Sequence, residues 1–280
     1  MTTQKSDASF DSAQQLEEDG RPRKGKRGTW LKRILLGLAV LLVVLVGVGA
    51  WYVSDYYHAD ATALEAMADA DGTSDGVAVR EMPGGSVAFV PCAESGEALP
   101  AEGFIFYSGG KVQPESYAPL LTELARHGVL CVMVRPLFNL AILSVNAADG
   151  VREAFPQVNS WSISGHSLGG VAACLYATNH ANEFRSIVLL AAFPMSDISG
   201  YGGEVLELRG TNDGLVTEER FSEAREKFPS TLKDPLIEGG NHAYFGNYGE
   251  QAGDGVATIS REEQQARAVS AIVDLLQPSK

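Results

Sequence analysis

The chain has 280 residues, of which 45% are hydrophobic and 20% are charged. Both fractions are ordinary for globular proteins, and they exclude a chain that is disordered or membrane-embedded throughout. Its three cysteines have no closely spaced pair of the kind that binds metal. The segment after residue 53 carries 14 basic and 30 acidic residues, a net charge of −16. Such an acidic segment has no electrostatic reason to bind nucleic acid, and we expect it to form a solvated domain.

An uncharged apolar run occupies residues 34–53, which read ILLGLAVLLVVLVGVGAWYV. A helix of that length spans roughly 30 Å, the thickness of a bilayer core. The preceding residues 1–33 hold 8 basic and 5 acidic residues, and the basic cluster over 21–33 should stay in the cytoplasm. The pattern predicts an uncleaved signal anchor, with a disordered cytoplasmic tail over 1–33 and one transmembrane helix over 34–53. The protein is then a single-pass protein of the cell membrane with an extracytoplasmic C-terminal part.

Two other interpretations of the apolar run stay open. Residues 48–50 read VGA and resemble the small-residue cleavage site of a secretory signal peptide. The run is, however, longer than the roughly 7–15 apolar residues of such a signal. The third interpretation is a buried helix of a soluble domain.

After a predicted juxtamembrane linker over residues 54–75, short apolar runs alternate with amphipathic stretches. This alternation predicts an α/β fold with a mainly parallel central sheet and helices on both faces. The first two strands are expected to form an antiparallel pair at the edge. Strands are expected at 76–82, 86–91, 103–107, 129–136, 161–167, 186–194, 204–213 and within 231–243. Helices are expected at 116–128, 139–155, 168–184, 217–228 and 260–276, the last with Ser260 as its N-cap.

The strongest chemical signal lies at residues 165–170, which read GHSLGG and match the pattern G-x-S-x-G. A predicted strand runs into this motif and a predicted helix runs out of it, so we expect Ser167 on a sharp turn. A serine there points its hydroxyl away from the sheet. It also lies at a helix N-terminus, where free N–H groups favour a developing negative charge. The alternative is a glycine-rich turn with a helix-capping serine.

A serine nucleophile needs a base that takes its proton and an acid that orients the base. Among the five histidines, His242 is the one downstream of the serine on a loop after a strand. That edge of an open α/β sheet is where ligand sites form. Asp213 ends the preceding strand and completes a predicted catalytic triad in the order Ser167, Asp213, His242. A surface-loop histidine and a turn aspartate remain the simpler interpretations, and Asp197 and Asp234 are rival acids.

Backbone N–H groups should stabilise the negative charge that develops on a substrate oxygen. Leu168, directly after the nucleophile, and Gly110, in the glycine loop after an early strand, are the predicted oxyanion-hole donors. Lys111 adjoins that loop and could bind an anionic group of a substrate, or be simply solvated. Four aromatic residues either line the pocket or pack in the core: Tyr107, Phe138, Tyr244 and Phe245.

From about residue 103 to its end, the chain resembles the α/β-hydrolase superfamily. More narrowly, it resembles small bacterial membrane-anchored hydrolases related to dienelactone hydrolase. The resemblance implies acyl transfer from a small-molecule ester to water through an acyl-enzyme, without a cofactor. Dienelactone hydrolase has a cysteine nucleophile where this chain has Ser167, so its lactone substrate is a poor guide. The motifs that carry the resemblance are FIFYSGGKVQPESYAPL, VRPLFNLAIL, GHSLGG, GTNDGL and GGNHAYFGNYG.

The sequence thus predicts a membrane-tethered extracytoplasmic serine esterase with an α/β-hydrolase domain over residues 76–280. Only about ten residues separate the strand that ends near Pro194 from the strand that begins near Glu204, which leaves no room for a helical cap. We therefore expect an open, shallow site, which argues against interfacial lipase action. Two alternatives remain. One is an acyltransferase or peptidase that acts on envelope components with the same triad, and the other is a catalytically idle binding protein on a hydrolase scaffold.

Overall fold

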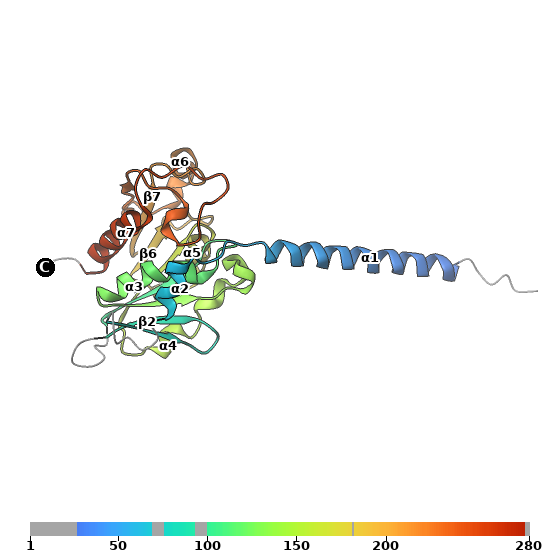
Figure 1. Cartoon of the computed structure of the whole chain (residues 1–280), viewed down its shortest axis with the longest axis horizontal. Coiled ribbons are helices and arrows are strands. Elements are labelled where there is room, and N and C mark those ends of the chain that lie inside the picture. Colours follow the sequence, from blue (N-terminus) through green and yellow to red (C-terminus); the bar gives the residue numbers. More distant parts are fainter. Residues whose placement is uncertain (1–26, 69–75, 93–99, 181, 278–280) are drawn as a thin grey trace, which may run out of the picture. The chain divides into compact units, whose positions relative to one another are not determined.

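The computed structural model describes residues 27–68, 76–92, 100–180 and 182–277 (Figure 1). The chain divides into two units, Met1–Ala50 and Trp51–Lys280. Most of the predicted cytoplasmic tail, residues 1–26, and the last part of the predicted linker, residues 69–75, lie outside the described residues.

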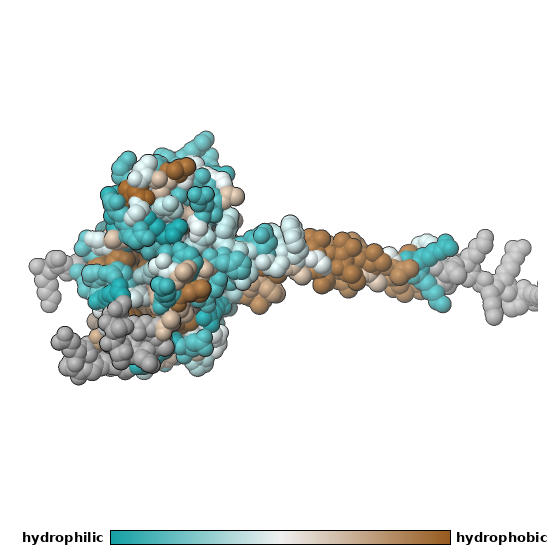
Figure 2. Space-filling model, in the orientation of Figure 1, coloured by the Kyte–Doolittle hydropathy of each residue, from teal (hydrophilic) through white to brown (hydrophobic). Residues whose placement is uncertain are grey.

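The apolar run forms the helix α1 (Arg27–Ser54). Its segment Trp30–Ser54 is long and apolar enough to cross a membrane, and none of that segment is buried. Figure 2 shows a continuous apolar surface along α1 with hydrophilic side chains at its N-terminal end. Because a buried helix of a soluble domain would be covered, this exposure favours the other two interpretations, a membrane anchor or a signal sequence.

The second unit is built on one eight-stranded sheet with the order β1-β2-β4-β3-β5-β6-β7-β8. Strand β2 pairs antiparallel with both β1 and β4, and all other neighbours are parallel. The predicted mainly parallel sheet with an antiparallel edge is thereby confirmed. The strands are β1 (Val77–Glu81), β2 (Val87–Pro91), β3 (Glu102–Tyr107), β4 (Val129–Val134), β5 (Ser160–His166), β6 (Ser186–Leu190), β7 (Glu204–Gly210) and β8 (Leu236–Ile237).

Helices cover both faces of the sheet because its strands are apolar on both sides. In β3, Phe104 and Phe106 belong to one buried cluster, whereas Ile105 and Tyr107 belong to the other. The first cluster includes side chains of α3 (Ala118–Arg126) and α7 (Arg261–Leu276), and the second includes side chains of α5 (Leu168–Asn179) and α6 (Glu218–Ala224) (Figure 1). The predicted N-cap of the last helix is confirmed, since the Ser260 side chain accepts a hydrogen bond from the Glu263 N–H.

The helix predicted over residues 139–155 is wrong. That stretch contains 3₁₀ turns at Leu137–Asn139, Ala141–Leu143 and Val145–Ala148, followed by the short helix α4 (Val151–Ala154). Asn139 has a φ of 56° and Gly150 a φ of 77°, and neither left-handed conformation continues a helix. The Tyr107 hydroxyl also donates to the carbonyl of Val145 and accepts from the N–H of Ala148, so it satisfies backbone groups that a helix would use itself.

Two glycines allow β5, α5 and β3 to meet at very short range. A Cβ atom on Gly165 would lie within 3.0 Å of the Gly169 backbone, and one on Gly169 would lie within 3.0 Å of the Tyr107 carbonyl group. The atoms in the way are backbone atoms of neighbouring elements, which cannot turn aside as a flexible side chain can. The start of α5 is therefore fixed against the end of β3.

We predict that Gly169→Ala lowers the free energy of unfolding by about 1–3 kcal/mol, because the added methyl group overpacks the junction of α5 with β3. Denaturant titration of the full-length protein in detergent measures the effect. Gly200→Ala is the matched control, because a Cβ there has no atom within 4 Å. Equal midpoints for both variants would contradict the packing argument.

Candidate active site

Ser167 lies on the turn between β5 and α5 with φ 52° and ψ −121°. A non-glycine residue in this region costs of order 1–3 kcal/mol, and the conformation persists where the surroundings over-determine it. The Ser167 N–H donates to the Leu190 carbonyl at 2.9 Å, and the Ser167 carbonyl accepts from the Gly170 N–H at 3.0 Å. The side chain is half-buried at the start of α5, where the first N–H groups lack partners within the helix.

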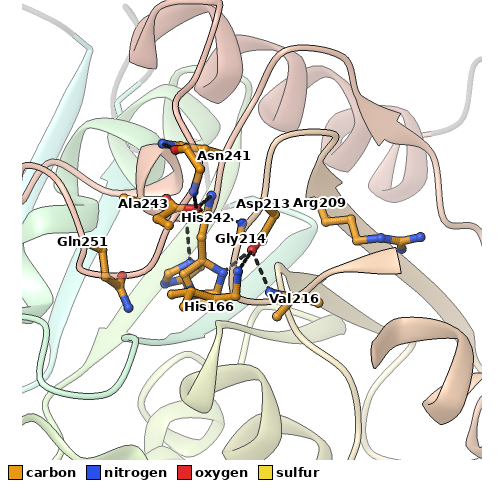
Figure 3. A network of polar contacts seen from close by, with 12 residues as sticks. His166, Arg209, Asp213, Gly214, Val216, Asn241, His242, Ala243 and Gln251 are labelled. Carbon is orange, nitrogen blue, oxygen red and sulfur yellow. Dashed lines mark hydrogen bonds and ion pairs between the residues drawn. The ribbon is translucent and has the colours of Figure 1, made fainter. Parts of the chain in front are cut away.

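His242 and Asp213, predicted from loops 29 residues apart, are in contact (Figure 3). Nδ1 of His242 lies 2.9 Å from Oδ2 of Asp213, and each side chain is only 1% exposed. The other oxygen of Asp213 accepts from the N–H groups of Leu215 and Val216 at 2.8 and 2.7 Å. Because an ionised carboxylate only accepts, we assign the proton to Nδ1. Nε2 then keeps a lone pair, and it is buried with no hydrogen-bond partner in the described part of the chain.

His166 connects the serine turn to the loop of His242. Its ring centre lies 4.6 Å from that of His242, and its Nε2 donates to the His242 carbonyl at 3.1 Å. Nδ1 of His166 therefore accepts, and its donor is the Tyr117 hydroxyl at 2.7 Å. The Tyr117 oxygen in turn accepts from the Gly109 N–H at 3.1 Å. This chain of hydrogen bonds joins the glycine loop, the serine turn and the His242 loop.

Burial lowers the pKa of His166 well below its usual value of 6.5, and the neighbouring His242 lowers that pKa further. The imidazole of His166 is consequently neutral near pH 7. A neutral ring agrees with the hydrogen bonds, since protonated His166 could not accept a hydrogen bond from Tyr117 at Nδ1.

The glycine loop after β3 lies against the start of α5. A Cβ atom on Gly110 would be 2.9 Å from Cδ2 of Leu168, so the two predicted oxyanion-hole residues are neighbours. Both residues next to Gly110 use their N–H groups within the fold: Gly109 donates to Tyr117, and Lys111 donates to the Asn139 carbonyl at 2.8 Å.

Sequence reasoning missed Asp254, whose carboxylate ties together the two loops that carry Asp213 and His242. Its Oδ1 accepts from the N–H of Gly214 at 3.1 Å and from that of His242 at 3.1 Å. Its Oδ2 accepts from the N–H of Ala243 at 2.8 Å. The sequence around Asp254 holds only an aspartate between glycines, a pattern common to surface turns, so no local signal marked this residue.

The rival acids have other roles in the structure. Oδ1 of the exposed Asp197 accepts from the Ser199 N–H at 2.8 Å, and this hydrogen bond lowers the pKa of Asp197. Asp234 pairs with Arg225 at 2.5 Å. The structure thus brings Asp213, and not these two residues, to the His242 ring.

The remaining predicted pocket residues are divided between core and surface. Tyr107 and Phe245 are fully buried, so they pack in the core. The Arg261 guanidinium lies 4.8 Å from the centre of the Tyr244 ring, and Phe138 is 52% exposed. The Lys111 ammonium lies 2.9 Å from Asp55, and its contact with a substrate stays a prediction. Among the residues that the structure describes, no cluster of three or more His, Cys, Asp or Glu side chains could hold a metal ion.

Comparison with known proteins supports the fold. The profile of the Alpha/beta hydrolase family matches residues 103–266, and a search of curated proteins gives no match. Est1E from Butyrivibrio proteoclasticus is similar with a TM-score of 0.51 and 14% identity, over 71% of this chain and 98% of that one. TT1662 from Thermus thermophilus is similar with a TM-score of 0.52 and 16% identity, over 72% of this chain and 99% of that one. A membrane phospholipase A, described as a bacterial virulence factor, is similar with a TM-score of 0.55 and 13% identity, over 89% of this chain and 100% of that one. At these identities the structural likeness shows the fold alone.

We predict that His166 makes the folded state sensitive to acid. As the pH falls through 6.5, the unfolded chain binds a proton at this position and the buried ring does not, so stability decreases. The loss approaches about 1.4 kcal/mol per pH unit for one proton. His166→Gln keeps a donor and an acceptor but does not titrate, so its stability should fall less steeply below pH 6.5 than that of the wild type.

Denaturant titrations between about pH 5 and pH 7 measure this difference in slope. Ser164→Ala is the control: it alters the strand that contains His166 without removing a titratable group, so its slope should equal that of the wild type. Parallel curves for the wild type and His166→Gln would show that the buried ring takes up a proton in the folded state.

Proposed function

Since the chain belongs to the α/β-hydrolase family, we propose that this hydrolase cleaves carboxylic esters with Ser167 as its nucleophile. One observation carries the proposal. Nδ1 of His242 lies 2.9 Å from Oδ2 of Asp213, its Nε2 is buried without a partner in the described chain, and its ring lies 4.6 Å from that of His166, the residue before Ser167. An unpartnered Nε2 can serve as the base that takes the proton of a serine hydroxyl.

The geometry supports the following steps. The Oγ atom of Ser167 attacks the acyl carbon while its proton moves to Nε2 of His242, and Asp213 stabilises the resulting imidazolium. The N–H groups of Leu168 and Gly110 donate to the oxyanion. When the tetrahedral intermediate collapses, His242 gives the proton to the leaving alcohol and the acyl-enzyme remains. A water molecule then attacks the acyl carbon as it gives a proton to His242. His242 passes that proton to Oγ when the second tetrahedral intermediate collapses, which releases the acid and restores Ser167.

The neutral state of His166 is suited to this sequence of steps. A charged ring 4.6 Å from His242 would oppose the imidazolium that forms there. Because burial keeps His166 neutral, the ring contributes its hydrogen bond to the His242 carbonyl without adding a positive charge.

The proposal includes the location of the enzyme. The helix α1 anchors the protein in the cell membrane with its N-terminus in the cytoplasm and the hydrolase domain outside. The support is the uncharged run over residues 34–53, the basic cluster over residues 21–33 and the exposure of α1.

We predict that a fluorophosphonate probe labels the wild type and that Ser167→Ala abolishes both labelling and p-nitrophenyl ester turnover. Ser164→Ala is the matched control, because it removes a buried hydroxyl from β5, the strand that leads to Ser167, and that hydroxyl has no hydrogen-bond partner within the described residues. Gel fluorescence and ester hydrolysis give the two readouts. Labelled Ser167→Ala would remove this serine from the mechanism, whereas a wild type that neither reacts nor turns over esters would indicate an idle binding protein.

We also predict that Asp254→Asn slows acylation on the order of 10- to 100-fold. The asparagine NH₂ group replaces an acceptor that faces backbone N–H groups, so the loops of Asp213 and His242 shift. The labelling rate with the fluorophosphonate probe measures acylation. Asp197→Asn is the control, because the hydrogen bond described for the Asp197 carboxylate is a local one, from the N–H of Ser199 two residues later. Similar rates for both variants would show that the Asp254 carboxylate has no role in positioning His242.

A further inference from the structure

Large apolar side chains gather on the surface after β4. The exposed fractions are 58% for Leu137, 52% for Phe138, 39% for Ile142 and 59% for Leu143. We call residues 137–143 the apolar loop. Single exposed apolar residues are common on soluble proteins, but four within seven positions form a patch of the kind that marks an interaction site.

The backbone of the apolar loop is strained at Phe138. Phe138 has φ 57° and ψ 26°, a left-handed conformation that is unfavourable for a bulky residue. Its exposed ring gains no core packing that would offset this strain. The loop is nevertheless fixed, since the Leu137 N–H donates to Oγ of Ser144 at 2.9 Å and the Asn139 carbonyl accepts from the Lys111 N–H at 2.8 Å. The fold therefore favours presenting the apolar side chains to the surroundings.

The apolar loop lies close to the point where the chain leaves α1. Lys111, which donates to Asn139, also accepts through its carbonyl a hydrogen bond from the Tyr57 N–H at 2.7 Å. Tyr57 is three residues after Ser54, the last residue of α1. Three residues of extended chain reach at most about 11 Å. This limit holds for any direction of α1, so an anchored helix keeps the loop near the bilayer.

The same contacts place the apolar loop near the chemistry. Lys111 follows Gly110, and Gly110 packs on Leu168, the residue after Ser167. An acyl chain that lies along the apolar loop would thus approach the predicted oxyanion donors directly.

We propose that the apolar loop inserts into the surface of the membrane that α1 spans, and that Ser167 acts on acyl esters dissolved in that bilayer. This inference rests on the proposed anchor and esterase activity. It departs from the expectation, drawn from the missing cap, that argued against interfacial lipase action. A loop after β4 offers a lipid-facing surface without covering the site, so a cap is not required. Acidic surface charge opposes binding to anionic lipids, and the apolar side chains supply the attraction instead.

The contact is tested on the full chain in liposomes. An environment-sensitive fluorophore is attached to Leu143→Cys in a Cys92→Ser background, in which the remaining Cys131 and Cys174 are buried. His127→Cys is the matched control. It is comparably exposed and lies just before β4, at the opposite end of the strand that leads to the apolar loop.

We expect blue-shifted emission and quenching by nitroxide-labelled lipids at position 143, and water-like, unquenched emission at position 127. Water-like emission at both positions from protein that floats with the liposomes would overturn the loop contact and leave the anchor intact. Protein that fails to float after an alkaline wash would overturn the anchor, and this inference with it.

A second experiment tests the substrate class. Leu137→Gln/Leu143→Gln should reduce turnover of a long-chain ester embedded in liposomes by about tenfold or more, because lipid contact is lost. Turnover of a water-soluble short-chain ester should stay unchanged. Met195→Gln, which alters another exposed apolar residue, should affect neither substrate. Equal loss on both substrates, or no loss on either, would overturn the inference. Wild-type protein inactive on both would instead contradict the proposed esterase activity.

Discussion

The hydrogen bond from Nε2 of His166 to the His242 carbonyl joins two parts of the chain that the site needs together. His166 is fixed by β5 and by the turn that strains Ser167, whereas His242 stands on a loop 76 residues later. Because burial keeps the His166 ring neutral, its other nitrogen, Nδ1, can accept a hydrogen bond from the Tyr117 hydroxyl at the same time. A single uncharged ring thereby links the loop of the proposed base to the residue that precedes the proposed nucleophile.

Around this ring, the site is held by groups that satisfy backbone N–H donors. Asp213 accepts from two such groups and Asp254 accepts from the loops on either side of it. Tyr117 accepts from the glycine loop and donates to His166. Together with the buried Phe245, these hydrogen bonds hold the loops in place, as the regular backbone hydrogen bonds hold strands and helices.

Local pattern was enough to predict the strands, the serine turn, and the pairing of Asp213 with His242. Each of these depends on a signal within a few residues, such as an apolar run or glycines that permit close packing. The segment after β4 was mispredicted because its composition suits a helix, while Tyr107 and the left-handed Asn139 impose separate turns. Asp254 and Tyr117 escaped prediction because their partners are distant in sequence, and only the folded chain brings them together.

The bridge between Tyr57 and Val112 has a practical consequence for producing the domain without its helix. Residues just after α1 pair with the segment that follows the glycine loop, and Asp60 then contacts Asn247 and Arg261 before α2 (Ala61–Ala68) begins. A soluble form cut at residue 76 would lose all of these contacts and expose the side of α3 on which α2 packs. A cut between Ser54 and Tyr57 would keep them, so the natural N-terminal limit of the folded domain lies within a few residues of the apolar helix.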